Sequence, residues 1–397
     1  MSHLSYMEKL LDGVEVEWEA LGDIGKVSMC KRVLKHQTSS KGDVPFYKIG
    51  TFGKEPDAYI TRELFEEYKT KYSYPQAGEV LISASGTIGR TVIFDGQDSY
   101  FQDSNIVWIE NNESEILNKY LYYFYQIVNW NVAEGGTIKR LYNDNLRKIK
   151  VPIPPLNVQA EIVRILDTFT ELTAELTAEL TARQQQYAYY RDKLLTFEEG
   201  EVEWMPLGDI AENLDSKRKP ITSSLREPGD IPYYGASGIV DYVKDYIFDG
   251  DYLLVSEDGA NLIARNTPIA FSISGKNWVN NHAHVLKFET YAERKYVEYY
   301  LNSIDLTPYI SGAAQPKLNQ KNLNSIKIPN PSLEEKKRIV SILDKFDALT
   351  TSLTEGLPRE IELRQQQYEY YRDLLLSFPK PEVVAHDWTN KNDCWIE

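Results

Sequence analysis

The segment Leu172-Thr-Ala-Glu-Leu-Thr-Ala-Glu-Leu180, followed by Arg183-Gln-Gln-Gln-Tyr187, decides the fold of this chain of 397 residues. Its leucines recur every four residues and extend an apolar stripe that begins at Ile162. This spacing places apolar side chains on one face of an α-helix. The pattern therefore predicts one long helix over about residues 157–200, and each Thr-Ala-Glu-Leu unit adds about 6 Å to its length.

A second helix of the same kind is predicted because the motif returns later in the chain. Arg364-Gln-Gln-Gln-Tyr368 repeats it, and Tyr370-Tyr-Arg-Asp373 repeats Tyr189-Tyr-Arg-Asp192. Three further blocks occur twice in the same order: 16–24 with 202–210, 149–156 with 326–333, and 162–167 with 339–344. The chain is therefore two copies of one unit, a pseudo-two-fold internal repeat. Gly356 and Pro358 predict a break in the second helix.

The blocks between the shared motifs differ from each other. Residues 25–148 and 211–325 hold short runs of β-branched and aromatic residues separated by Gly, Asp and Asn, which predict strands and turns. We therefore predict an α+β fold in which two mixed α/β domains are joined by two long antiparallel helices that pack like a coiled coil. The predicted boundaries are a segment 1–13 that resembles the end of a repeated helix, a first domain 14–156, the first helix 157–200, a second domain 201–331, the second helix 332–378 and a flexible tail 379–397.

Composition indicates a globular cytoplasmic protein. Cys30 and Cys394 are the only cysteines and lie in no pairing or metal-binding pattern. No apolar run approaches the ~20 residues that a membrane span needs, and the first residues do not read as a signal peptide. The net charge of −15 argues against nucleic acid, because phosphate binding depends on Lys and Arg. Local basic clusters at residues 137–150, 217–219 and 315–327 weaken that objection, although they also fit solvated loops.

These motifs together identify a family resemblance. Over essentially its whole length the chain resembles the specificity subunit of type I restriction–modification systems, and most of all the branch called type IC. The resemblance rests on residues 172–180, on both copies of Arg-Gln-Gln-Gln-Tyr with Tyr-Tyr-Arg-Asp, on Gly356-Leu-Pro-Arg-Glu-Ile361, on Tyr233-Tyr-Gly-Ala-Ser-Gly238 and on Ser256-Glu-Asp-Gly-Ala-Asn261.

The resemblance implies a DNA-reading subunit without an active site. Each variable domain, called a target recognition domain in this family, would read one half of a bipartite DNA site. The helices would set the gap between the half-sites and dock two methyltransferase subunits, which use S-adenosylmethionine. Restriction subunits, which use ATP and Mg²⁺, would join that complex. The chain itself is expected to bind no cofactor and no metal.

Residues with donors, acceptors or positive charge in the variable blocks are the predicted DNA contacts. They are Lys48, Ser83, Ser85, Thr87, Arg90, Gln102, Asn105, Thr137, Lys139, Arg140, Lys217, Arg218, Tyr233, Tyr234, Ser237, Asn261, Arg265, Asn280, Asn281, His282, Gln315 and Lys317. Several lie in segments that also read as ordinary turns, and Tyr233 and Tyr234 also fit a buried strand. The predicted spacer and docking residues are Leu172, Leu176, Leu180, Arg183, Tyr187, Tyr190, Arg364, Tyr368 and Tyr371.

Two other functions were weighed against DNA recognition. Methyltransferase and ATPase motifs are absent from the sequence. His282 and His284 form a pair without a nearby third ligand, which rarely makes a metal site. The alternative function is a magnesium-dependent DNA endonuclease that uses Asp57, Glu67 and Lys69. Residues 60–72 read as a solvated helix, and the second copy lacks this pattern, so the DNA-specificity subunit remains the main interpretation.

Overall fold

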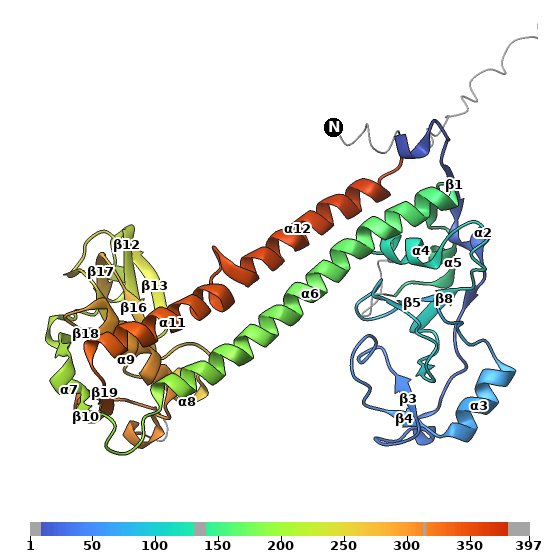
Figure 1. Ribbon diagram of the computed structural model, residues 1–397. Coiled ribbons are helices and arrows are strands. Elements are labelled where there is room, and N and C mark those ends of the chain that lie inside the picture. Colours follow the sequence, from blue (N-terminus) through green and yellow to red (C-terminus); the bar gives the residue numbers. More distant parts are fainter. Residues whose placement is uncertain (1–8, 131–139, 313–314, 380–397) are drawn as a thin grey trace, which may run out of the picture. The chain divides into compact units, whose positions relative to one another are not determined.

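The computed structural model describes residues 9–130, 140–312 and 315–379, and it divides the chain into two compact units (Figure 1). Unit 1 comprises residues 1–174 and 362–397, and unit 2 comprises residues 175–361. The division cuts through both long helices, so each unit consists of one variable domain and a part of each helical segment. The sequence-based boundaries instead treat the helices as separate segments.

Unit 1 contains three small sheets. A two-stranded sheet pairs β1 with β9, a four-stranded sheet has the order β2-β8-β5-β6, and a three-stranded sheet has the order β4-β3-β7. Their bounds are β1 Glu17–Ala20, β2 Val27–Ser28, β3 Val44–Tyr47, β4 Tyr59–Ile60, β5 Val80–Ser83, β6 Thr91–Ile93, β7 Tyr100–Phe101, β8 Ile106–Ile109 and β9 Lys150–Ile153. The helices are α2 Leu21–Ile24, α3 Arg62–Lys71, α4 Asn118–Phe124 and α5 Asn143–Arg147.

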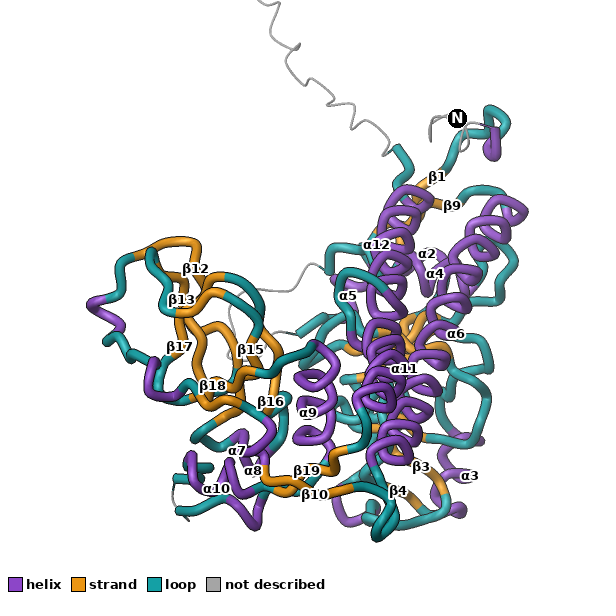
Figure 2. The backbone as a smooth tube through the Cα atoms, turned by 60° about the vertical axis from the view of Figure 1, so that its left-hand side comes forward, coloured by secondary structure: helices purple, strands orange, loops and turns teal. Residues whose placement is uncertain are grey.

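Unit 2 repeats this architecture. Its sheets have the orders β10-β19, β11-β18-β15-β16 and β13-β12-β17-β14. The strands are β10 Glu203–Pro206, β11 Glu212–Asn213, β12 Pro228–Gly235, β13 Gly238–Val243, β14 Phe248–Asp249, β15 Tyr252–Ser256, β16 Ala270–Ile273, β17 Lys276–Val279, β18 Ala283–Lys287 and β19 Lys327–Asn330. The helices are α7 Leu207–Ile210, α8 Asn261–Ala264, α9 Tyr291–Ser303 and α10 Gln320–Ser325. Figure 2 shows α9 beside these strands, and it packs against β16.

The two halves of the repeat match in strand register. Ile82 of β5 pairs with Val107 of β8, and Val255 of β15 pairs with His284 of β18 in the same way. In each unit the shared sequence blocks before and after the variable block form strands that pair with each other: β1 pairs with β9, and β10 pairs with β19. The predicted internal repeat is therefore a repeat of structure as well as of sequence.

The long helices form where the apolar spacing predicts them. Helix α6 runs over Leu156–Leu195, slightly shorter than the predicted segment. The second helical segment is broken as predicted, into α11 (Leu333–Thr351) and α12 (Gly356–Leu376). Gly356 has a positive φ of 80°, and an added Cβ would lie 2.3 Å from the Ala348 carbonyl oxygen, so glycine is required at this break. The side chain of Ser332 accepts a hydrogen bond from the Glu335 amide and caps α11.

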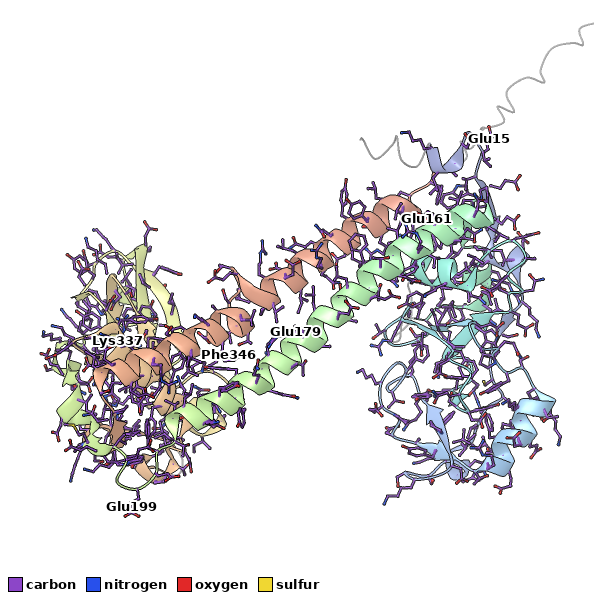
Figure 3. The ribbon with its side chains drawn as sticks, viewed as in Figure 1. Glu15, Glu161, Glu179, Glu199, Lys337 and Phe346 are labelled. Carbon is purple, nitrogen blue, oxygen red and sulfur yellow. The ribbon has the colours of Figure 1, made fainter. Side chains whose placement is uncertain are left out.

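Aromatic stacking joins the helices inside each unit. In unit 1, Tyr371 of α12 stacks on Phe169 of α6, with ring centroids 5.4 Å apart. In unit 2, Tyr190 of α6 stacks on Phe346 of α11, with centroids 5.8 Å apart, and Tyr187 stacks on the same ring. Figure 3 shows Phe346 on the α11 side of this contact. Both contacts use repeat-equivalent residues, so the helix packing has the same two-fold pattern as the sequence.

An equivalent tyrosine in each unit forms a hydrogen bond between the variable domain and a long helix. Tyr123 of α4 donates a hydrogen bond to Asp167 of α6 over 2.5 Å, and Tyr299 of α9 donates one to Asp344 of α11 over 2.6 Å. The side chain of Lys119 pairs with the same Asp167 carboxylate over 2.6 Å. The signal for this contact is the spacing Lys-Tyr-x-x-Tyr at residues 119 and 295, which the sequence analysis did not use.

The start and the end of the described chain meet in the core of unit 1. Leu10 and Leu11 pack against a cluster that contains Leu375 and Leu376, and the Trp18 indole donates a hydrogen bond to the Pro379 carbonyl. The predicted segment 1–13 and tail 379–397 lie largely outside the described residues. Among the helices of the described ranges, none is both long and apolar enough to cross a membrane.

Candidate nucleic-acid interface

The predicted DNA contacts of unit 1 converge on one end of its four-stranded sheet. Here β5 leads into the loop 83–90, β8 begins, and residues 140–141 lie alongside. The Ala84 amide donates to the Asn105 carbonyl over 2.7 Å, and the Leu141 amide donates to the Ala84 carbonyl over 2.8 Å. Ser85 and Arg140 form a β-bridge. Three segments that are distant in sequence are thus held together at this end.

Unit 2 builds the same arrangement from the equivalent residues. The Glu257 amide donates to the His282 carbonyl over 2.9 Å, and the Leu318 amide donates to the Glu257 carbonyl over 2.7 Å. Asp258 and Lys317 form the β-bridge. The trio Ser85, Asn105 and Arg140 therefore corresponds to Asp258, His282 and Lys317. We call these two places the sheet ends of unit 1 and unit 2.

Hydrogen bonds within the loop 83–90 fix its conformation. Ser83 is only 1% exposed, and its hydroxyl donates to the Thr87 carbonyl and accepts from the Arg90 amide. Gly89 has a φ of 81°, and an added Cβ would collide with the Trp130 ring at 2.1 Å, so this position needs glycine. The Ser83 hydroxyl is buried and bonded within the loop, which favours a role in shaping the loop over the predicted DNA contact.

The other predicted contacts of unit 1 are tied to the same end. The Gln102 side chain accepts from the Ile49 amide over 2.9 Å, which links the segment of Lys48 to the start of β8. The Arg90 guanidinium donates to the Phe52 carbonyl over 2.9 Å, and Arg140 donates to the Ser104 carbonyl over 2.8 Å. Ser85 is buried and donates to the Asn105 side chain, so we correct its role to holding Asn105. Thr87 is exposed, whereas Thr137 and Lys139 lie outside the described residues.

Three predicted contacts of unit 2 are buried or largely enclosed in the structure, which favours structural roles for them. Tyr233 is 1% exposed, its hydroxyl accepts from the Ile221 amide, and Arg226 lies over its ring. The Asn280 side chain is buried and accepts from the His282 amide. Arg218 is enclosed with two carboxylates at the sheet end. These three side chains make contacts inside the domain that hold its loops, so their position favours a structural role.

The remaining predicted residues of unit 2 divide into two groups. Asn261 holds its own loop by bonding both backbone groups of Thr267, and Arg265 donates to the Asn302 carbonyl at the end of α9. Tyr234 is half-buried beside Phe271. The exposed group is Lys217, Ser237, Asn281, His282, Gln315 and Lys317. The Ser256 hydroxyl donates to the Ala236 carbonyl, which brings the turn that carries Ser237 to the same sheet end.

The predicted docking residues of the helices are mostly engaged in packing. Tyr187, Tyr190 and Tyr371 stack as described above, and the Tyr368 hydroxyl donates to the Gln126 side chain over 2.6 Å. Arg183 bonds Gln186 over 2.8 Å, and Arg364 bonds Gln367 over 3.0 Å in the equivalent geometry. Leu172, Leu176 and Leu180 are half-buried along one helix face. Docking by these residues stays a prediction.

Two exposed tyrosines were missed by the sequence analysis. Tyr189 and Tyr370 are each 60% exposed and occupy equivalent positions in the repeat. Each contacts the following tyrosine edge-on at 5.3 Å between centroids. Beside them lie the equivalent ion pairs Arg191–Asp192 (2.7 Å) and Arg372–Asp373 (2.6 Å). The motif Tyr-Tyr-Arg-Asp contained this signal, but only the helix packing shows that the first tyrosine of each pair is the more exposed.

The residues of the nuclease alternative do not form one site. Asp57 pairs with Lys48 at 2.8 Å, Glu67 with Lys71 at 3.0 Å, and Lys69 with Asp98 at 3.2 Å. Each charge is therefore balanced by a different neighbour. The endonuclease interpretation loses its catalytic centre for this reason.

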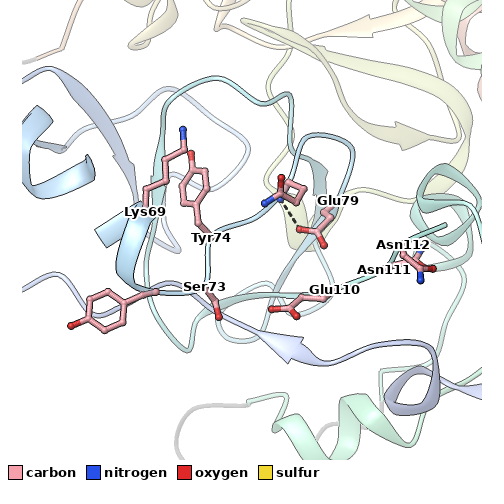
Figure 4. Close-up of a pocket in the computed structure, with 9 residues that line it drawn as sticks. Lys69, Ser73, Tyr74, Glu79, Glu110, Asn111 and Asn112 are labelled. Carbon is pink, nitrogen blue, oxygen red and sulfur yellow. Dashed lines mark hydrogen bonds between the residues drawn. The ribbon is translucent and has the colours of Figure 1, made fainter. Parts of the chain in front are cut away.

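An open pocket of about 720 Å³ lies at the other end of the unit 1 sheet, lined in part by Lys69, Tyr74, Glu79 and Glu110 (Figure 4). Glu79 precedes β5 and Glu110 follows β8, which are antiparallel, so both lie away from the loop 83–90. The Glu79 carboxylate accepts from the Gln76 amide over 2.7 Å, and burial raises its pKa. Glu79 closes a turn here, and the pocket is separate from the sheet-end residues.

The sheet end of unit 2 also holds a buried group of possible metal ligands. Oxygen and nitrogen atoms of Asp215, Glu257 and His284 lie within 4.8 Å of one another. The Arg218 guanidinium lies 2.6 Å from Glu257 and 3.3 Å from Asp215, and the Lys317 ammonium lies 3.0 Å from Glu257. The two carboxylates are thus already paired with the cationic side chains of Arg218 and Lys317, which take the place that a metal ion would need. His282 contacts a different carboxylate, that of Asp258, at 2.9 Å.

These contacts predict an acid-sensitive stability. Burial raises the pKa values of Asp215 and Glu257, but bonds from His284 and Arg218, with Lys317 also on Glu257, hold both below their ordinary values of 3.8 and 4.5. A carboxylate with a lowered pKa stabilises the folded state above its ordinary pKa, and that contribution is lost as pH falls through the lowered value. We therefore expect the free energy of unfolding to fall with pH below about 4.5.

Denaturant titrations from pH 7 down to pH 3 measure this dependence. The variant Asp215→Asn/Glu257→Gln should be less stable at pH 7 and should show a shallower loss of stability on acidification. An equal slope in the parent and the variant would contradict the assignment of these two carboxylates.

Comparison with known proteins places the chain in a family. Residues 15–183 and 199–363 match the model of the type I restriction modification DNA specificity domain. The chain is 38% identical over 416 aligned residues to the type I restriction enzyme EcoR124I/EcoR124II specificity subunit of Escherichia coli, covering 97% of this chain and 100% of that protein. It is also 64% identical over 197 residues to a putative type I specificity subunit of Haemophilus influenzae, covering 48% of this chain and 51% of that protein.

The fold agrees with these matches. The crystal structure of a type I restriction–modification system S subunit from M. genitalium superposes with a TM-score of 0.59 at 15% identity, over 93% of this chain and 98% of that one. The two matched segments coincide with the two halves of the internal repeat. The chain therefore belongs to the family of type I restriction–modification DNA specificity subunits.

Proposed function

We propose that each sheet end reads one half of a bipartite DNA site. The observation that carries this proposal is the repetition of one polar arrangement, Ser85–Asn105–Arg140 and Asp258–His282–Lys317, on the same end of two equivalent sheets. Two copies of one surface in a single chain act as a dimer does, and dimers read two separated half-sites. Arg140 and Lys317 supply positive charge for phosphates or base edges, despite the net charge of −15.

The proposal includes the partners that the family resemblance implies. A specificity subunit is a non-catalytic component, so the chemistry belongs to other chains. Two methyltransferase subunits would dock on the helices and carry S-adenosylmethionine, and restriction subunits with ATP and Mg²⁺ would join them. The chain itself would bind no cofactor. It would work in the cytoplasm, where its DNA is found.

A charge-removal experiment tests the DNA interface. In the complex with methyltransferase subunits, we expect Arg140→Ala to reduce methylation of one half-site and Lys317→Ala that of the other, each by roughly 10-fold. The salt dependence of DNA affinity should become shallower by about one ion per lost phosphate contact. Mapping of methylated adenines and titrations at several salt concentrations give both readouts.

Matched control lysines lie at the opposite ends of the same four-stranded sheets. Lys26 is near Glu110 after β8, and Lys287 ends β18. Lys26→Ala and Lys287→Ala should leave both half-sites and the salt dependence unchanged. If the control variants weaken DNA binding as much as Arg140→Ala and Lys317→Ala do, the interface is not at the sheet ends.

Exposed aromatic residues on the helices are the proposed anchors for the methyltransferase subunits. Tyr189 and Tyr370 present the same ring and the same neighbouring Arg–Asp pair twice, which fits two copies of one partner. Either Tyr189→Ala or Tyr370→Ala should weaken binding of one methyltransferase subunit by roughly 10-fold and leave the other in place. Native mass spectrometry of the complex during dilution distinguishes loss of one subunit from loss of both, and unchanged stoichiometry in both variants would remove these tyrosines from the interface.

A further inference from the structure

The buried ionic cluster at the sheet end of unit 2 is not repeated at the equivalent described positions of unit 1. It consists of Asp215, Arg218, Glu257 and His284, whose side chains are at most 12% exposed. Strand register identifies the equivalent positions, because Ile82 pairs with Val107 where Val255 pairs with His284, and β2 pairs with β8 as β11 pairs with β18. Met29, Ala84 and Val107 stand in unit 1 where unit 2 has Asp215, Glu257 and His284.

Folding of the sheet does not require this cluster. Unit 1 closes the same four-stranded sheet with apolar side chains at the three positions. Burying ions costs solvation energy, and an apolar core of the same shape is often at least as stable as a buried ion pair. A role other than stability therefore accounts better for charges at this place.

The cluster contacts Lys317 and the residue that follows it, Leu318. The Lys317 ammonium lies 3.0 Å from the Glu257 carboxylate, and the Leu318 amide donates to the Glu257 carbonyl over 2.7 Å. His284 reaches the Leu318 carbonyl through Nε2 over 2.7 Å and Asp215 through Nδ1 over 2.5 Å. The His284 ring therefore bridges the Asp215 carboxylate and the Leu318 backbone.

The same cluster holds the segment of His282. The Arg218 guanidinium donates to the Ala283 carbonyl over 2.8 Å and to Glu257 over 2.6 Å. Arg218 also offsets the negative charge of Glu257, which would otherwise repel a phosphate close to Lys317. Because the Lys317 side chain is still 50% exposed, its ammonium is held in place yet remains accessible. In unit 1 the corresponding cation, Arg140, donates to the neutral Ser104 carbonyl, and within the described residues no salt bridge joins it to a carboxylate.

We propose that Asp215, Arg218, Glu257 and His284 are positioning residues that fix Lys317 and the backbone beside His282 for recognition by unit 2 alone. This inference rests on the proposed DNA-reading function of the sheet ends. A cation fixed before binding loses less side-chain entropy when it meets DNA. Recognition by unit 2 therefore depends on a buried charge network, whereas recognition by unit 1 does not.

The experiment converts the cluster of unit 2 into the residues of unit 1. Asp215→Met/Glu257→Ala/His284→Val is compared with the parent in the full complex with methyltransferase subunits. We expect methylation of the unit 2 half-site to fall by roughly tenfold and that of the unit 1 half-site to stay unchanged. Lys317→Ala added to this triple variant should have little further effect, because the lysine has already lost its fixed position.

A second variant guards against simple misfolding. Glu257→Gln keeps the shape of the side chain and removes its charge, so it should lower unit 2 methylation and change its salt dependence. The loss of the Arg218 pair also lowers the melting temperature, so the assays are run well below it, and unchanged methylation of the unit 1 half-site shows that the complex is folded and assembled. Unchanged unit 2 methylation in both variants, or effects of the triple variant and Lys317→Ala that simply add, would overturn the positioning role. Methylation of two separated half-sites by the parent complex tests the proposed function itself, so the two failures are distinguishable.

Discussion

Insertion of one more Thr-Ala-Glu-Leu unit after Leu180 is expected to keep both half-sites and to lengthen the gap between them by one base pair. Helix α6 is continuous over Leu156–Leu195, so four added residues lengthen it by about 6 Å and rotate the remainder of the helix by about 40° beyond a full turn. Leu172, Leu176 and Leu180 are half-buried at four-residue intervals, and the inserted leucine continues this face. The change therefore acts on distance and leaves folding and base identity intact.

Mapping of methylated adenines in the insertion variant measures the new gap. DNA bending and helix flexibility should absorb the difference between 6 Å and one base-pair step. Methylation of the original site should fall by roughly tenfold or more, since reaching it now requires deformation of the DNA. A control insertion of Thr-Ala-Glu-Leu in the loop 198–201, outside the helix, should not lengthen the gap in the same way. An unchanged gap with full activity would show that α6 does not set the spacing.

Replacement of residues 25–148 by the matching block of a relative is expected to change one half-site completely and to leave the other unchanged. The segments that flank the block are joined to each other, because β1 pairs with β9 and the Leu21 amide donates to the Ile149 carbonyl over 2.8 Å. The shared sequence on either side of the block makes these contacts. The flanking segments of unit 2 are joined in the same way, and the Leu207 amide donates to the Ile326 carbonyl over 2.8 Å.

The expected effect is large because the whole reading surface of unit 1 is exchanged. Methylation of the old half-site should fall by roughly 10³-fold or more, the usual margin between specific and non-specific binding. The reciprocal exchange of residues 211–325 is the matched control and should change the other half-site. If either exchange alters both half-sites, or several exchanges prevent assembly, the domains are not independent readers.

The sequence alone determined the repeat, the long helices and the family. Local sequence patterns predict these features: the four-residue leucine spacing predicts α6, and Gly356 with Pro358 predicts the break before α12. Runs such as those at residues 80–82 and 252–255 are strands, as their β-branched and aromatic content predicts. Backbone propensity and hydrophobic period are properties of neighbouring residues, so they are readable without a structure.

Tertiary structure alone decided which polar residues are exposed and which are buried. Ser83, Tyr233 and Asn280 read as DNA contacts in the sequence, but the folded domains bury their side chains, which bond to backbone groups nearby in the chain. The spacing of the repeated blocks aligns Arg140 with Lys317, but only the β-bridges place both of them at equivalent sheet ends. Asp215, Glu257 and His284 meet only because antiparallel pairing brings distant strands together. Strand pairing across dozens of residues depends on the whole fold, and no local pattern in the sequence encodes it.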